Sequence, residues 1–228
     1  MQTIGLLGGM SWQSTVTYYR LLNEGVADHL GGLHSARILL RSVDFEAIEA
    51  CQRESRWDDA GALLAEAARS IEAGGADFLL LCTNTMHRLA EHIEDAISIP
   101  MVHIADATAD AALEADVHRV GLLGTRYTME QDFYRGRLSV GGLEVLTPPE
   151  GDRERVHRVI YDELCHGVVE HDSRREFRRI IADLVDCGAE AVILGCTEIG
   201  LLVRPHDASV PVFDTTKLHV EAALKRAL

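Results

Sequence analysis

The stretch IGLLG (residues 4–8) returns later in the chain as VGLLG (residues 120–124), and it decides how the fold is organised. Two further pairs follow in the same order: GADFLLL (75–81) with GAEAVIL (188–194), and SIPMV (98–102) with SVPVF (209–213). Counted between first residues, the offsets are 116, 113 and 111. Ordered matches at nearly one offset predict two lobes built on one plan and related by a pseudo-twofold axis. A generic alternation of strands and helices is the alternative.

Short apolar runs alternate with longer amphipathic segments along the whole chain. Apolar residues recur at helical spacing from Val16 to Leu30, and again from Leu63 to Ile71, before a pair of glycines. The spacing from Ser173 to Glu176 is that of a capping box and predicts a helix start there. The apolar runs predict strands at residues 3–7, 36–43, 78–82, 101–104, 120–123, 143–146 and 191–194.

Strands that lack strict alternation and are separated by helices favour a parallel sheet covered on both faces. The predicted fold class is therefore α/β, with two similar lobes that each hold a parallel sheet flanked by helices. Residues 1–105 plus 212–228 are assigned to the first lobe and residues 106–211 to the second, with the active site in the cleft between them.

The composition restricts the class of partner. With 47% hydrophobic residues the chain can build a core, and its net charge of −14 argues against nucleic acid or anionic membranes as partners. No apolar run approaches the ~20 residues of a membrane span, and the start lacks a signal-type segment. Five widely spaced cysteines fit neither a disulfide framework nor a four-thiolate zinc site. We expect a reduced, soluble, cytoplasmic protein.

Two polar turns follow matched strands. Extending the second sequence match without gaps pairs Thr83 with Cys196 and Asn84 with Thr197. Ligands of open parallel sheets bind at the carboxyl ends of strands, so side chains 83 and 196 are expected to face one cleft from opposite sides. Cys82 lies one residue earlier and is expected to point elsewhere, as a small buried hydrophobe.

This pairing suggests a chemistry. Two groups on opposite faces of a carbon can invert a stereocentre, because one removes a proton and the other returns one. A thiolate is a competent base and a thiol a competent acid, so Cys196 suits the task. A threonine hydroxyl is far less acidic, so Thr83 is expected to deliver or relay a proton. Backbone N–H groups and hydroxyls at helix starts would favour a carboxylate substrate.

Longer motifs carry a resemblance to a known family: GLLGGMSW (5–12), CTNTMH (82–87), GTRYTMEQDFYRGRL (124–138), GCTEIG (195–200) and PVFDTT (211–216). Over essentially its whole length the chain resembles the aspartate/glutamate racemase family. It is most similar to the bacterial branch of broad-specificity amino-acid or L-aspartate/glutamate racemases. The resemblance implies a cofactor-independent isomerase of amino-acid metabolism that forms D-amino acids, with one acid/base residue from each lobe. It also implies a homodimer.

The family's two catalytic cysteines fall on Thr83 and Cys196, so the sequence departs from the usual pair at its first position. Cys165 aligns where aspartate-specific members carry a lysine for the side-chain carboxylate, which questions a preference for acidic substrates. The preferred amino acid, whether aspartate, glutamate, homoserine or another, is not fixed by the sequence. The substrate-binding positions implied by the resemblance are Met10, Gln52, Asn84, Thr85, Thr197 and Glu198, the last for the ammonium group.

Alternatives stay open at several of these positions. Cys196 could be an inert buried thiol, Glu198 a helix cap, and Gln52 a solvent-facing residue. Thr125 and Thr128 could line the cleft or only cap the next helix.

No cofactor or metal is expected. Pyridoxal phosphate needs a lysine for its Schiff base, and the only lysines, Lys217 and Lys225, lie near the C-terminus. The histidines do not form the His-Glu-x-x-His pattern, and the glycines of the first turn lack a phosphate-loop motif. Two rival functions remain: a non-catalytic amino-acid binder, and a decarboxylase, maleate-type isomerase or hydantoin racemase on the same scaffold.

Overall fold

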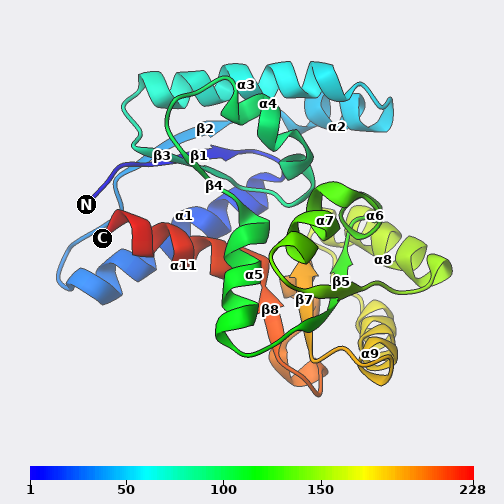
Figure 1. Ribbon diagram of the computed structural model, residues 1–228. Helices are drawn as coiled ribbons and strands as arrows, with labels where there is room; N and C mark the ends of the chain where they lie inside the picture. The colour runs from blue at the N-terminus through cyan, green and yellow to red at the C-terminus, as the bar shows by residue number, and fades with distance from the viewer. The chain divides into compact units, whose positions relative to one another are not determined.

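The computed structural model describes all 228 residues, which form two compact units (Figure 1). The first comprises Met1–His103 and His219–Leu228, and the second Ile104–Leu218. In chain order the elements are β1 (Ile4–Gly8), α1 (Trp12–Leu30), β2 (Ile38–Ser42), α2 (Phe45–Arg53), α3 (Trp57–Ala73), β3 (Phe78–Leu81), the 3₁₀ helix η1 (Thr85–Leu89), α4 (Ala90–Glu94), β4 (Met101–Val102), α5 (Ile104–Glu114), β5 (Arg119–Gly124), α6 (Arg126–Glu130), α7 (Asp132–Val140), β6 (Glu144–Leu146), α8 (Glu150–Asp162), η2 (Leu164–His166), α9 (His171–Asp186), β7 (Ala191–Gly195), α10 (Ile199–Leu202), η3 (Pro205–Asp207), β8 (Val212–Asp214) and α11 (Thr215–Ala227).

Each unit holds one four-stranded sheet, and the two sheets have the same plan. The strand orders are β2-β1-β3-β4 and β6-β5-β7-β8, and every pairing is parallel. The three sequence matches fall on β1 and β5, on β3 and β7, and on β4 and β8. The prediction of an α/β fold with two similar lobes, each a parallel sheet flanked by helices, is confirmed.

Burial on both faces explains why the strands lack alternation. In the first sheet, alternate residues of β1 and β3 enter two separate apolar clusters. Leu7, Leu79 and Leu81 pack with residues of α2 and α3, whereas Leu6 and Leu80 pack with residues of α1 and α11. A strand covered on both sides has no solvent face on which to place polar side chains. The second unit has one continuous apolar cluster around β5 and β7.

Two details of the sequence analysis differ from the structure. Helix α9 begins at His171 with Glu170 as its N-cap residue, so the predicted capping box at Ser173 is wrong. Ser173 already lies inside the helix and is 1% exposed. Residues 104–105 and 212–218 belong to the second unit rather than the first. The second of these segments joins that unit because β8 extends its sheet by pairing with β7. The change of unit therefore falls inside α11.

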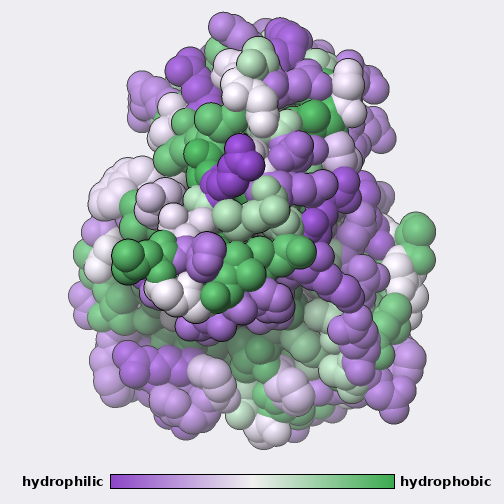
Figure 2. All heavy atoms as spheres, turned by 90° about the vertical axis from the view of Figure 1, so that its left-hand side faces the viewer, coloured by the Kyte–Doolittle hydropathy of each residue, from purple (hydrophilic) through white to green (hydrophobic).

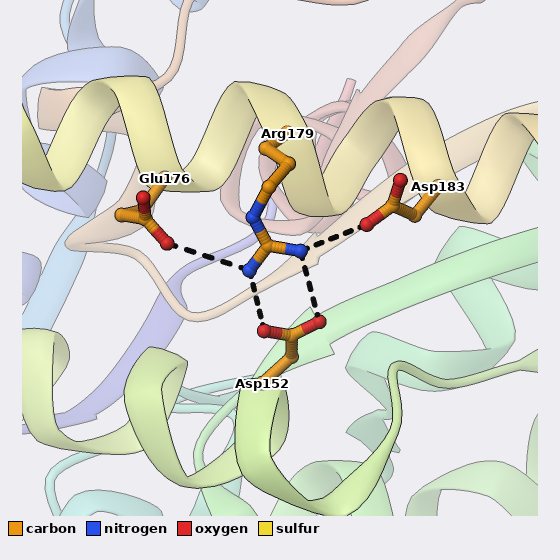
Figure 3. A network of polar contacts seen from close by, with 4 residues as sticks. All are labelled: Asp152, Glu176, Arg179 and Asp183. Atoms are coloured by element: carbon orange, nitrogen blue, oxygen red, sulfur yellow. Dashed lines mark hydrogen bonds and ion pairs between the residues drawn. The ribbon is translucent and has the colours of Figure 1, made fainter.

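A polar network joins two helices of the second unit (Figure 3). Arg179 of α9 donates to both carboxylate oxygens of Asp152 on α8, at 2.5 and 3.2 Å. The same guanidinium contacts Asp183 at 2.8 Å and Glu176 at 3.4 Å, both on its own helix. Asp152, and to a lesser extent Glu176, raise the pKa of Arg179 above its ordinary value. The fork of the arginine thus fixes α8 against α9.

On the face seen in Figure 2, hydrophilic side chains are interspersed with patches of hydrophobic ones. Three of the most exposed large apolar residues lie at helical spacing on α1, namely Trp12, Val16 and Tyr19. None of the helices is both long enough and apolar enough to traverse a lipid bilayer.

Candidate active site

The turn after β1 holds Met10 in a fixed place. The Thr15 hydroxyl accepts the Gly9 N–H at 2.8 Å and donates to the Ser11 carbonyl at 3.0 Å. Gly9 has φ of +100°, and a Cβ there would collide with the Val43 carbonyl. Only glycine fits this position without strain. Met10 is consequently 4% exposed at the carboxyl edge of the first sheet.

The turn after β3 buries three consecutive polar residues. Thr83, Asn84 and Thr85 are 8%, 4% and 7% exposed. The Thr83 N–H donates to the Leu81 carbonyl at 2.9 Å, which turns the chain sharply at the strand end. Because Leu7 and Leu81 are paired in the sheet, this turn lies at the same edge as the Met10 turn. Clustered polar residues in an otherwise apolar setting mark this edge as a candidate site.

The burial of Cys82 and of Gln52 tests two expectations from the sequence. Cys82 is fully buried among apolar residues such as Leu6 and Leu80, and burial raises the pKa of its thiol. The prediction that Cys82 is a small buried hydrophobe is confirmed. Gln52 of α2 is 3% exposed, so the alternative of a solvent-facing residue is wrong.

In the second unit, β7 ends in Gly195 and delivers Cys196 to the corresponding edge. A Cβ at Gly195 would lie 3.0 Å from the Leu123 carbonyl oxygen, so glycine permits the close approach of β5. Cys196 is 8% exposed, and its S–H donates to Glu198 Oε2 at 2.9 Å. The Thr197 hydroxyl donates to the same oxygen at 2.7 Å. The Glu198 carboxylate therefore accepts hydrogen bonds from both of the side chains that precede it in the turn.

Electrostatics determine the resting state of Cys196. Burial raises the pKa of its thiol well above the ordinary value, and the charge of Glu198 and the proximity of Cys165 raise it further. At neutral pH the ligand-free protein therefore carries a thiol here, not a thiolate. Burial also raises the pKa of Cys165 to about 12, with a contribution from Glu198. Cys165 is thus a neutral neighbour of this turn.

Glu198 is not a helix cap. It occupies the N-cap position of the short helix α10, but its side chain makes no capping hydrogen bond. Its Oε2 instead accepts from Cys196 and Thr197. The helix-cap alternative is therefore wrong, and the carboxylate is placed to exchange a proton with the thiol.

The structure adds residues that sequence reasoning left unassigned. The Thr215 hydroxyl donates to the Leu194 carbonyl at 2.8 Å and ties the start of α11 to the end of β7. Thr125 is the N-cap residue of α6, and its hydroxyl accepts the Thr128 N–H at 3.3 Å. The motif PVFDTT was the available signal for Thr215, but a motif does not say which backbone group a hydroxyl meets.

The structure contains no group of three or more His, Cys, Asp or Glu side chains placed to hold a metal ion. The polar side chains of the two turns are those of Thr83, Asn84 and Thr85 in the first unit and of Cys196, Thr197 and Glu198 in the second. These side chains supply hydroxyls, one thiol, one carboxylate and one amide, which are groups that can donate or accept protons.

Two α/β units on one plan, each with a polar turn after the third strand of its sheet, define a class of two-lobed racemases. The sequence model of the Asp/Glu/Hydantoin racemase family matches residues 7–223, and the chain belongs to that family. A solved Yersinia pestis protein, provisionally described as an Asp/Glu racemase, is 53% identical with a TM-score of 0.94. The alignment covers 100% of this chain and 99% of that one.

Two further relatives are more distant. An aspartate racemase homologue from Pyrococcus horikoshii OT3 is 32% identical with a TM-score of 0.87, covering 100% of this chain and 99% of that one. The broad specificity amino-acid racemase RacX of Bacillus subtilis (strain 168) is 24% identical over 221 residues. That match covers 93% of this chain and 92% of RacX. Membership of the family supports amino-acid racemase activity, which makes the protein an isomerase.

Proposed function

We propose that the protein is a pyridoxal-phosphate-independent amino-acid racemase that inverts the α-carbon of a small amino acid. Cys196 and Thr83 handle the proton on opposite faces. The observation that carries the proposal is the matched position of the two turns. Each turn follows the third strand of a sheet with the same strand order, at the edge where ligands of parallel sheets bind.

The first step belongs to Cys196. Its S–H already donates to Glu198, so the carboxylate takes the proton when the thiolate forms. A substrate ammonium group near Glu198 places a positive charge beside the sulfur and lowers the pKa of the thiol. The thiolate then removes the α-proton, and the electron pair left on the α-carbon delocalises into the substrate carboxylate.

The second step returns a proton from the other face. The Thr83 hydroxyl donates its proton to the α-carbon, and a water molecule reprotonates Thr83. The hydroxide left by that water takes the proton that Glu198 received in the first step, which returns Cys196, Glu198 and Thr83 to their resting states. The Asn84 and Thr85 turn binds the substrate carboxylate, and Thr197 binds it from the other unit. Because the chain carries a net charge of −14, these local donors are needed to attract a carboxylate at all.

The side chain of the substrate is uncharged in this proposal. An acidic side chain would need a cation, whereas Cys165, which interacts electrostatically with Cys196 and Glu198, is a neutral thiol. Met10 and Gln52 supply one apolar and one amide surface in the first unit. We therefore expect homoserine and similar amino acids to react faster than aspartate or glutamate.

Deuterium exchange tests the function. The protein is incubated in D₂O with L-aspartate, L-glutamate, L-homoserine and other amino acids, without added cofactor, and loss of the α-proton is followed by NMR. We expect exchange and inversion with at least one amino acid and neither with Cys196→Ser. Exchange with none of the panel would contradict the proposal.

A non-catalytic amino-acid binder is the second candidate, favoured by the hydroxyl at Thr83 and by the raised pKa of the Cys196 thiol. A binder would show saturable calorimetric binding of an amino acid without α-proton exchange.

The resemblance also leads us to propose a homodimer in the cytoplasm. Light scattering after gel filtration tests the dimer, and cell fractionation tests the location.

A further inference from the structure

Three buried histidines of the first unit meet beside the Thr83 turn. The ring of His87 lies 4.4 Å from that of His103 and 5.8 Å from that of His219, measured between centroids. The three residues are 2%, 3% and 0% exposed. We call them the histidine cluster. Histidine is costly to bury unless its ring nitrogens are satisfied, so such a cluster calls for an account of its hydrogen bonds.

His219 is held in one protonation state. Its Nε2 lies 2.8 Å from the Val102 carbonyl oxygen, which can only accept, so Nε2 carries the proton. Burial lowers the pKa of His219 to about 4, so the ring is neutral and Nδ1 is an acceptor. Nδ1 then accepts the Tyr18 O–H at 2.8 Å. The two hydrogen bonds hold the His219 ring in one orientation, and the His87 ring packs against it.

His87 closes the Thr83 turn on itself. Its Nδ1 lies 2.7 Å from the Thr83 carbonyl oxygen, so Nδ1 carries the proton and donates it. The His87 backbone N–H donates to the Asn84 carbonyl at 3.1 Å. Side chain and backbone of one residue therefore hold two successive carbonyls of the turn.

The cluster also sits at the boundary of the first unit. The chain leaves that unit after His103 and returns to it at His219. The ring bonded to the Thr83 carbonyl thus packs against the two residues where the chain changes units.

We propose that His87 is a positioning residue for Thr83. Its ring N–H fixes the Thr83 carbonyl, and with it the backbone that aims the Thr83 hydroxyl, while His103 and His219 keep the ring in place. That this matters for proton transfer rests on the proposed function. The claim that His87 holds the turn does not depend on the proposed function.

Amide hydrogen exchange tests the holding role. His87→Phe keeps a flat ring but has no N–H, whereas His87→Asn keeps an N–H donor but has no ring. We expect exchange across residues 82–90 to be at least about tenfold faster in His87→Phe than in wild type. His87→Asn should stay within about threefold of wild type, because its amide can reach the same carbonyl. His34→Phe, at an exposed histidine, is the control.

Wild-type protein gives a test that needs no variant. Nitrogen NMR of the His87 ring should show a proton on Nδ1 that exchanges slowly with solvent. A ring protonated only on Nε2, or a His87→Phe variant with wild-type exchange across the turn, would overturn the proposal. Equal acceleration in His87→Phe and His87→Asn would also overturn it, because the ring rather than the N–H would then matter.

The catalytic consequence has a separate readout, measured on an amino acid that wild type racemises. In His87→Phe we expect racemisation to fall at least about tenfold, while α-proton exchange through Cys196 changes less than about threefold. A general loss of structure would lower both rates in parallel and overturn the positioning role. If wild type exchanges no α-proton, the proposed function fails, and the amide and NMR results still decide whether His87 holds the turn.

Discussion

At residue 83 a hydroxyl occupies the position that a thiol, Cys196, occupies in the other unit. A hydroxyl can donate a proton but cannot persist as an alkoxide base near neutral pH. At residue 196 the thiol is buried and faces a carboxylate, so it too is protonated at rest. The two groups therefore need help of different kinds: Thr83 needs a proton source, and Cys196 needs Glu198 as a proton acceptor.

Thr83→Cys should raise the racemisation rate, because it supplies a second group that can act as base as well as acid. A proton-transfer partner is worth about 10²–10⁴-fold in rate, roughly 3–5 kcal/mol. Both directions must gain equally in kcat/KM, since the two enantiomers are equal in energy. Chiral chromatography of both reactions measures this, with Thr17→Cys on α1 as a control for an added thiol. A variant that is no faster in either direction would refute our account of Thr83.

Glu198→Gln should have two opposite effects. Removing the carboxylate charge lowers the raised pKa of the Cys196 thiol, so alkylation of Cys196 by iodoacetamide should reach half its maximum at a lower pH. Racemisation should nevertheless fall about 10²-fold or more, because the proton acceptor is gone. Mass spectrometry of the Cys196 peptide across pH follows the first effect. An alkylation profile that is unchanged or shifted to higher pH would show that Glu198 does not control the thiol.

At the scale of elements, polar groups fix helices that apolar packing places only approximately. Arg179 joins α8 to α9 (Figure 3). The ring of His219, on α11, joins α1 and β4 (Figure 1), because it accepts a hydrogen bond from Tyr18 and donates one to the Val102 carbonyl. The sequence indicated the helices by their apolar spacing. It could not indicate these bonds, because hydrogen-bond partners far apart in sequence have no periodic signal.

Arg179→Met should destabilise the protein by about 1–2 kcal/mol, because three carboxylates lose their shared cation and repel one another. Arg179→Lys keeps the charge but loses the fork and should cost less. The loss in Arg179→Met should shrink in 1 M NaCl, which screens the repulsion. Urea unfolding at low and high salt measures both. A loss independent of salt would show that the arginine acts by packing rather than by charge.

His219 should make the protein less stable in acid. Its folded-state pKa of about 4 lies below the ordinary 6.5, so the unfolded chain binds a proton that the folded chain excludes. Stability attributable to His219 is therefore intact above pH 6.5 and declines as the pH falls towards 4, by up to about 3 kcal/mol.

His219→Gln should flatten that part of the stability curve relative to wild type. Its amide can still donate to the Val102 carbonyl, but it does not titrate. His34→Gln, at an exposed histidine, is the control variant. Urea unfolding between pH 4 and 7 compares the three proteins. Parallel curves for His219→Gln and wild type would contradict the assignment.

At the scale of the whole molecule, the internal repeat predicted most of the architecture. IGLLG and VGLLG mark β1 and β5, and the register of the second match predicts that Thr83 and Cys196 occupy equivalent positions. The change of unit within α11 was not predictable, because a continuous helix carries no boundary signal. The bond from Cys196 to Glu198 was also missed, because the spacing of two residues does not reveal rotamers.

The central claim is that one group from each unit acts on the same α-carbon. The most direct test is the first-turnover product formed in D₂O from a single enantiomer, analysed for both chirality and mass. We predict that wild type yields inverted product with one deuterium and that Cys196→Ser yields none. Thr83→Ala should still exchange the α-proton but lose inversion. If Thr83→Ala inverts the substrate as fast as wild type does, a single group suffices and the two-sided account is contradicted.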